Sequence, residues 1–126
     1  MLCKGMKMYN SSFCKVEYLE NRDAILCEWK QFCKGDDYRN PFRYGAELIG
    51  QHNPTTWITD TTNGFENEEP DTEWLLEEFM PKMIVSSIEK IIFVIKNDSP
   101  LISEIMAQVD SLGEFFEVEF VESLDD

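Results

Sequence analysis

The sequence lacks several features that would place it in a familiar class of protein. Its longest apolar run, residues 91–95, is far too short to cross a bilayer. It has one histidine, and its four cysteines form no C-x-x-C pair, so a zinc site of usual spacing is excluded. Gly64 stands alone, so there is no glycine-rich phosphate loop. These absences exclude membrane spans, zinc modules and nucleotide-binding loops.

Basic residues are also scarce. The chain has 11 Lys and Arg against 25 Asp and Glu, which gives a net charge of −14. Such a chain is repelled by phosphate backbones and anionic lipids, so neither nucleic-acid binding nor membrane insertion is expected. A basic protein partner fits this charge better. The same bias makes an acidic, solvated surface the simplest expectation.

The N-terminal residues 1–12 have little apolar character and are expected to form a flexible leader. Lys4 and Lys7 are not followed by the apolar stretch of a signal peptide, so a cytoplasmic location is expected. Met6 or Met8 could be the true start. In a reducing cytoplasm the thiols stay free, and Cys14 and Cys27 are expected to be small buried side chains.

Residues 13–124 are predicted to form a single domain, since hydrophobic residues are 43% of the chain and can build a core. Residues 13–20 and 24–30 read as two strands of a hairpin joined by a polar loop. Residues 55–62 read as a third strand. Trp29 and Trp57, which lie on these strands, are core candidates.

The first helix is predicted to start near Asp36 or Asp37, either of which can cap it. A later start, with Asn40 as the cap and Pro41 as the first helical residue, is equally compatible with the pattern. Pro54 follows the expected end. Proline removes a backbone donor, so Pro41 is expected only in the first helical turn.

The second helix is predicted to start at Glu69, with Pro70 in its first turn and Pro81 kinking its middle. Residues 91–96 read as a strand that is covered on both faces, and residues 102–112 as a third helix. Residues 116–121 alternate apolar and acidic side chains, as an edge strand does. The expected apolar stripe of the second helix comprises Leu76, Met80, Met83 and Ile84, with Phe79 beside it.

The resulting order, β-β-α-β-α-β-α-β, predicts an α/β fold with a mostly parallel five-stranded sheet and an N-terminal antiparallel hairpin. Crossovers between parallel strands are right-handed in nearly all proteins. If the strands lie in sequential order, all helices cover one face of the sheet. The other face then needs a second layer or a second subunit, so a homodimer is worth testing.

The turn between the third strand and the second helix is the candidate functional region, because ligands bind at the carboxyl ends of strands in open α/β sheets. Residues 66–78 hold seven acids and no base. This run could bind a metal ion or a basic partner, or it could be a solvated surface matched to the helix dipole. The candidate partner-binding residues are Asp60, Thr62, Asn63, Thr72, Glu73 and Trp74.

Two of these candidates have alternative interpretations. Asp60 could accept a phosphoryl group, but the sequence offers no second carboxylate for magnesium, and Asp side chains at strand ends usually bond to local backbone. Trp74 could anchor a partner, or it could pack in the core. Lys96, at the end of a strand, could act with Asp60 or could simply be solvated. His52 has no obvious partner in the sequence.

Residues 58–63, the Thr72-Glu73-Trp74 helix start, Pro81 and residues 90–94 resemble the STAS/SEC14-like group of small bacterial proteins, which are also described as SpoIIAA-like anti-sigma-factor antagonists. The resemblance covers residues 13–124. It implies a STAS-like fold and a non-catalytic role in protein interaction. It also implies a phosphorylated serine at the start of the second helix, where this chain has Thr72 and lacks the Asp-Ser-Ser-Gly motif.

The sequence therefore leaves three hypotheses. The first is a non-catalytic interaction module that binds a protein partner or itself and uses no cofactor. The alternative is a small hydrophobic ligand or lipid-binding domain, as the SEC14-like resemblance implies, which requires an apolar cavity. An enzyme with Asp60 as nucleophile is the third and has the least support in the sequence.

Overall fold

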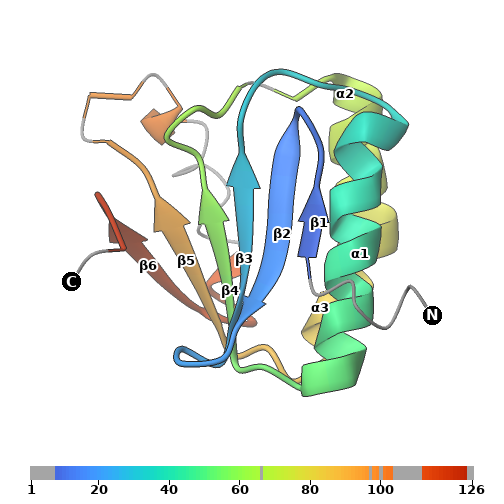
Figure 1. Cartoon of the computed structure of the whole chain (residues 1–126), viewed down its shortest axis with the longest axis vertical. Helices are drawn as coiled ribbons and strands as arrows, with labels where there is room; N and C mark the ends of the chain where they lie inside the picture. Colours follow the sequence, from blue (N-terminus) through green and yellow to red (C-terminus); the bar gives the residue numbers. More distant parts are fainter. Residues whose placement is uncertain (1–7, 66, 97, 100, 104–111, 125–126) are drawn as a thin grey trace.

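A six-stranded mixed sheet forms one layer of the structure and the helices form a second layer against it (Figure 1). The structure is a computed structural model that describes residues 8–65, 67–96, 98–99, 101–103 and 112–124. The strands are β1 (Met8–Asn10), β2 (Cys14–Leu19), β3 (Ala24–Trp29), β4 (Thr56–Asp60), β5 (Lys90–Val94) and β6 (Glu117–Val121).

The strands lie in the sheet in the order in which they occur in the chain. β2 is antiparallel to both of its neighbours, β1 and β3, and β3 to β6 are parallel. The α/β class, the hairpin and the edge position of β6 are thus confirmed. The strand number was wrong, because β1 adds a sixth strand within the expected leader. A three-residue strand is too short to leave a periodic pattern in the sequence.

Helix α1 (Asp36–His52) starts where the sequence suggested, but it is capped differently. Its N-cap is Gly35, at φ 63°, which has no side chain of its own to cap the helix, so the prediction of an Asp36 or Asp37 cap was wrong. The alternative start at Pro41 was also wrong, because this proline lies inside the helix. Its ring is fully buried against the core, which offsets the hydrogen bond that it cannot make.

The second helix is a composite of α2 (Glu69–Trp74), the π-helical turn η2 (Leu75–Phe79) and α3 (Met80–Ile84). The Met80 N–H bonds to the Leu75 carbonyl, five residues back, which widens the helix at this point. A proline ring clashes with the carbonyl four residues before it, here that of Glu77. The wider turn therefore accommodates Pro81 without ending the helix.

This wide turn changes which side chains face the sheet. Phe79 and Met83 are buried as predicted, but Leu76 is 59% exposed and Ile84 is 38% exposed. Because the predicted stripe assumed a regular helical repeat, its outer members were placed wrongly.

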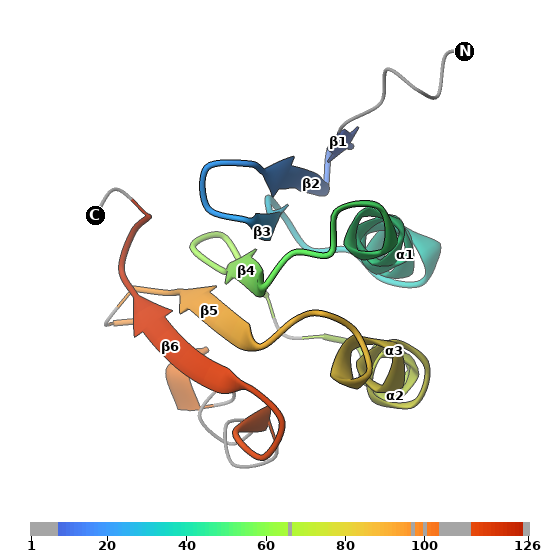
Figure 2. The same cartoon turned by 90° about the horizontal axis from the view of Figure 1, so that it is seen from below.

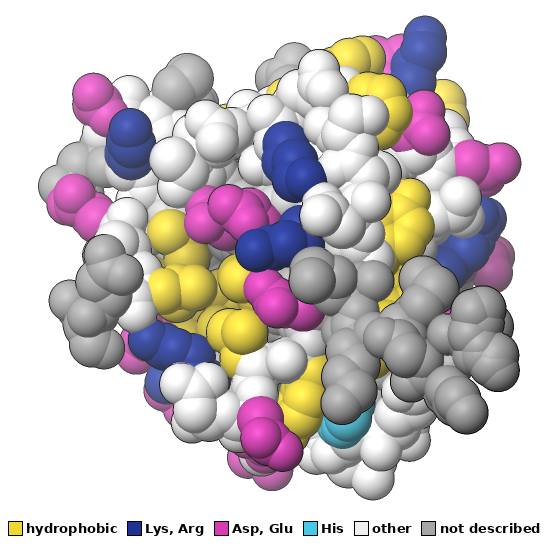
Figure 3. All heavy atoms as spheres, in the orientation of Figure 1, with side chains coloured by type: hydrophobic (Ala, Val, Ile, Leu, Met, Phe, Trp, Pro, Cys, Tyr) yellow, Lys and Arg dark blue, Asp and Glu magenta, His cyan; other side chains and the backbone are white. Residues whose placement is uncertain are grey.

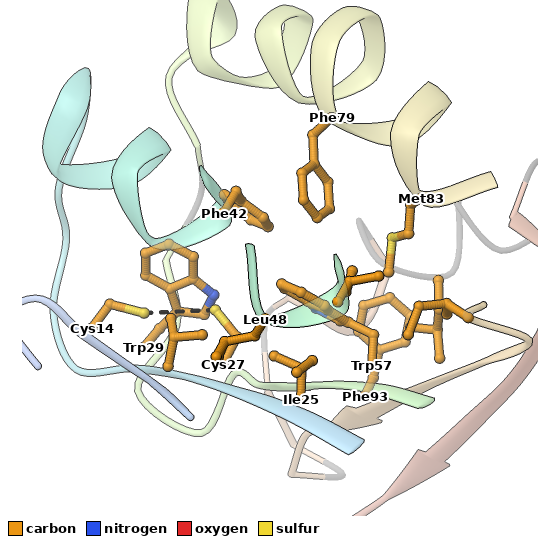
Figure 4. Packing of buried hydrophobic residues seen from close by; sticks show 14 of the residues in the cluster. Cys14, Ile25, Cys27, Trp29, Phe42, Leu48, Trp57, Phe79, Met83 and Phe93 are labelled. Atoms are coloured by element: carbon orange, nitrogen blue, oxygen red, sulfur yellow. Dashed lines mark hydrogen bonds between the residues drawn. The ribbon is translucent and has the colours of Figure 1, made fainter. Parts of the chain in front are cut away.

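The sheet has a different core on each face. The larger core lies on the helical side, where Phe42, Phe79 and Met83 point from the helices toward the sheet (Figure 4). Trp29 and Trp57 belong to it, as predicted. The core on the opposite face is smaller and consists of Ala24, Leu26, Ile58, Ile92 and Val94.

Figure 2 shows α1 and the composite helix on the same side of the sheet. Among the described residues, no helix covers the opposite face. Hydrophobic side chains lie there between acidic and basic ones (Figure 3). The sequential strand order thus has the consequence expected from right-handed crossovers. The predicted third helix falls largely on residues 104–111, outside the described residues.

Candidate functional site

An apolar cavity of about 210 Å³ lies between the helical layer and the sheet. It is larger than an engineered cavity of about 150 Å³ that takes up benzene. The lining residues come from every layer of the larger core, and seven of them are aromatic: Trp29, Tyr38, Phe42, Trp57, Phe65, Phe79 and Phe93. The volume and the lining suit a small apolar molecule.

Rigid aromatic rings keep the two layers apart around this cavity. The Phe42 ring from α1 stacks on the Trp57 ring from β4 at a centroid distance of 6.1 Å, and it also meets the Phe79 ring at 4.9 Å. Trp29 packs on Tyr38 at 5.1 Å. Rings held by other rings cannot turn to fill the remaining space, so the cavity persists beside them.

The cavity opens next to the wide turn of the composite helix. Leu75 and Leu76 line it from η2, while Thr61, Gly64 and Phe65 line it from the loop after β4. Leu76 is exposed, so it marks the mouth. The sequence had placed Leu76 on the core-facing stripe, and only the wide turn brings it to this position. Turns of this kind are frequent at functional sites.

Among the described residues that line the cavity, few are polar and none is charged. The polar side chains are those of Tyr38, Thr59, Thr61 and Asn67. The Thr61 hydroxyl donates to the Val94 carbonyl at 2.9 Å and is therefore already bonded. Burial raises the pKa of the Tyr38 phenol far above its usual value, so the phenol stays neutral.

The candidate residues at the end of β4 make local contacts or lie in solvent. Asp60 is half-buried, and its carboxylate accepts the Thr62 N–H at 2.9 Å. This is the local backbone bond that the structural interpretation of Asp60 predicted. Thr62 and Asn63 are exposed in the loop that follows. Lys96 is exposed too, as the solvated interpretation predicted.

The helix candidates face away from the cavity. The Thr72 hydroxyl donates to the Glu68 carbonyl at 3.4 Å, and Glu73 is exposed. The Trp74 ring is half-buried, and the guanidinium carbons of Arg39 and Arg43 lie 5.7 and 5.3 Å from its centroid. Such cation–π contacts fix the ring against α1. None of the six sequence candidates lines the cavity, and they do not form a single site.

Asp71 is the acid that the sequence could not single out. The residue is 2% exposed, whereas the neighbouring Glu69 and Glu73 are exposed. The Asp71 carboxylate accepts the Gly35 N–H at 3.0 Å and the Arg39 Nε–H at 3.0 Å. Asp71 of the composite helix thereby caps the N-terminus of α1 and holds the two helices together.

Cys14, Cys27 and Cys33 are buried free thiols, as was expected for Cys14 and Cys27. The sulfurs of Cys14 and Cys27 lie 3.6 Å apart. Burial and the neighbouring Cys14 thiol raise the pKa of Cys27. Burial also raises the pKa of Cys33 to about 12. Thiols that stay protonated are poor nucleophiles, so these groups act as core side chains.

Within the described ranges, no three His, Cys, Asp or Glu side chains are grouped so that they could hold a metal ion. No described helix is long and apolar enough to cross a membrane. Comparison with protein-family models, curated proteins and solved structures gave no match.

Proposed function

We propose that this chain binds a small apolar molecule in the cavity and performs no covalent chemistry on it. The observation that carries the proposal is a cavity of about 210 Å³ whose described lining residues include seven aromatic side chains and no charged one. Ligand sites in proteins are concave and mostly apolar, with a few polar groups that fix orientation. The cavity also lies at the carboxyl ends of parallel strands, where open α/β sheets bind ligands.

The energetic cost of the cavity supports an occupant. An enclosed empty cavity of this volume would cost about 5 kcal/mol, at about 24 cal/mol per Å³, and the cost is smaller here because the cavity opens at its mouth. The total stability of a domain is only about 5–15 kcal/mol. A ligand that fills the cavity recovers part of this energy, because it restores the packing contacts that the lining side chains lack.

The composition of the lining supports binding without catalysis. A general base or nucleophile must be able to reach the substrate. His52, the one histidine of the chain, is not among the lining residues, and its ring stacks on Tyr18 at 3.9 Å. Neither Cys14, Cys27 nor Asp60 lines the cavity.

Toluene is expected to bind the purified protein with a dissociation constant on the order of 1 mM or below, about −4 kcal/mol. Isothermal titration calorimetry measures this directly. Met80→Trp should abolish the binding, because Met80 lines the cavity and an indole would occupy the space. Val85→Trp is the matched control, since Val85 is 84% exposed and outside the lining. Wild-type protein that takes up no toluene would rule out this function.

A second proposal follows from the helix-free face of the sheet. The chain would be a non-catalytic interaction module with a STAS-like fold, and the partner on this face would be a second copy. Lys15 lies 3.2 Å from Glu17 and 3.5 Å from Glu28, and Lys90 lies 3.5 Å from Glu119. These lysine–glutamate pairs lie on both sides of an apolar strip. Each lysine can therefore also pair with the glutamates of a two-fold related copy.

Sedimentation velocity over a wide concentration range tests this second proposal. A dimer that dissociates as the salt concentration rises is expected, because salt screens the paired charges. A monomer at all concentrations would argue against self-association. The proposed partner would then be a basic protein in the cytoplasm.

A further inference from the structure

We propose that the ligand is a small neutral molecule with one hydrogen-bonding group, such as a hydroxyl, at the end of an apolar body. This inference rests on the proposed ligand-binding function and specifies the chemistry of the ligand. It is carried by the way polar and apolar groups are distributed along the cavity, and by one hydroxyl in the lining that makes no hydrogen bond to another described residue.

The cavity changes from apolar to polar along β4. Trp57 pairs with Ile91 of β5 at one level of the sheet, and Thr59 pairs with Phe93 at the next level toward the carboxyl end. Alternate strand residues share a face, so Trp57, Thr59 and Thr61 point to the helical side in turn. A ligand with its apolar body at the level of Trp57 would bring a polar end beside the threonines.

Thr59 provides the unused hydrogen-bonding group. The hydroxyl of Thr61 is already bonded to the Val94 carbonyl. Among the described residues, the Thr59 hydroxyl makes no hydrogen bond, although the residue is half-buried and lines the cavity. A hydroxyl can both donate and accept, so Thr59 can bond to an alcohol, a phenol or an amide.

The electrostatics of the site select a neutral ligand. A buried carboxylate needs a cation or several donors, and no described Lys, Arg or His lines the cavity. The net charge of −14 further repels an anion. A buried ammonium group would need a carboxylate, and none of the described lining residues carries one. The aromatic rings already pack against one another, so their faces are largely occupied.

Three probes of similar size test separately the apolar body, the hydrogen-bonding group and the absence of charge: toluene, p-cresol and 4-methylbenzoate. At neutral pH, p-cresol is expected to bind about fivefold more tightly than toluene, because it adds one net hydrogen bond. The 4-methylbenzoate anion is expected not to bind measurably. The three are titrated by calorimetry into the wild-type protein and two threonine variants.

Thr59→Val keeps the β-branched shape and removes the hydroxyl. It should weaken p-cresol binding about tenfold, since the hydroxyl of the ligand then lacks a partner, and it should leave toluene binding within about twofold. Thr62→Val is the matched control, because Thr62 is exposed and does not line the cavity. It should change neither affinity.

Each of the other outcomes is informative. Equal affinities for p-cresol and toluene, or no effect of Thr59→Val on p-cresol, would overturn the inference while the binding function stands. Tightest binding of 4-methylbenzoate would overturn it as well. If none of the three probes binds, the proposed function itself fails.

Discussion

Gly45→Ala is expected to lower the free energy of unfolding by about 1–3 kcal/mol, the usual cost of overpacking a core. Alanine normally stabilises a helix relative to glycine, so this sign is opposite to the helix preference. The reason is the closeness of α1 to β4: a Cβ at Gly45 would lie 2.5 Å from Cη2 of Trp57. Trp57 is buried and packs against the rings of Phe42 and Phe79, so a shift of its indole would disturb these ring contacts.

Gly50→Ala provides the matched control in the same helix. A Cβ at Gly50 meets no atom within 4 Å, so this variant should gain up to about 1 kcal/mol. Urea unfolding of both variants measures the two changes. Gly45→Ala should also weaken toluene binding, because Trp57 lines the cavity. If both variants are stabilised, the packing of α1 on the sheet described above is wrong.

Asp71→Ala is expected to lower the free energy of unfolding by about 1.5–3 kcal/mol, the range for hydrogen bonds to a charged group. The substitution removes the acceptor for the Gly35 N–H and the partner of Arg39. Because Arg39 remains partly exposed, water can solvate it, and the loss stays below that of a fully buried pair.

Two further variants make this measurement specific. Asp71→Asn keeps an acceptor oxygen but not the charge, so its stability should lie between those of the wild type and Asp71→Ala. Glu73→Ala removes an exposed acid from the same helix and should change the stability by no more than about 0.5 kcal/mol. A similar loss in the Glu73 and Asp71 variants would mean that general charge, rather than the cap of α1, stabilises this region.

The sequence predicted a strand or helix well where the side-chain pattern of that segment alone decides its structure. Alternation identified β2, β3 and β6, and the continuous apolar run identified β5 as covered on both faces. It failed where a distant residue decides the local structure. Gly35 at positive φ caps α1 because Asp71, which follows it by 36 residues, accepts its N–H.

The candidate site was predicted only in its location. The turn after β4 does flank the cavity, because strand ends and helix starts meet at this edge of the sheet. The cavity itself could not be predicted, since it depends on how rings from α1, β4 and the composite helix pack together. Thr59 carried no signal of its own, as it is one of several threonines around this strand.

A crystal structure of the protein with p-cresol tests most directly whether the apolar cavity is a ligand site. Ligand density is expected between Trp57 and Phe93, with the phenol oxygen within hydrogen-bonding distance of the Thr59 hydroxyl. An empty cavity in crystals saturated with p-cresol, or density only on the outer surface, would contradict it.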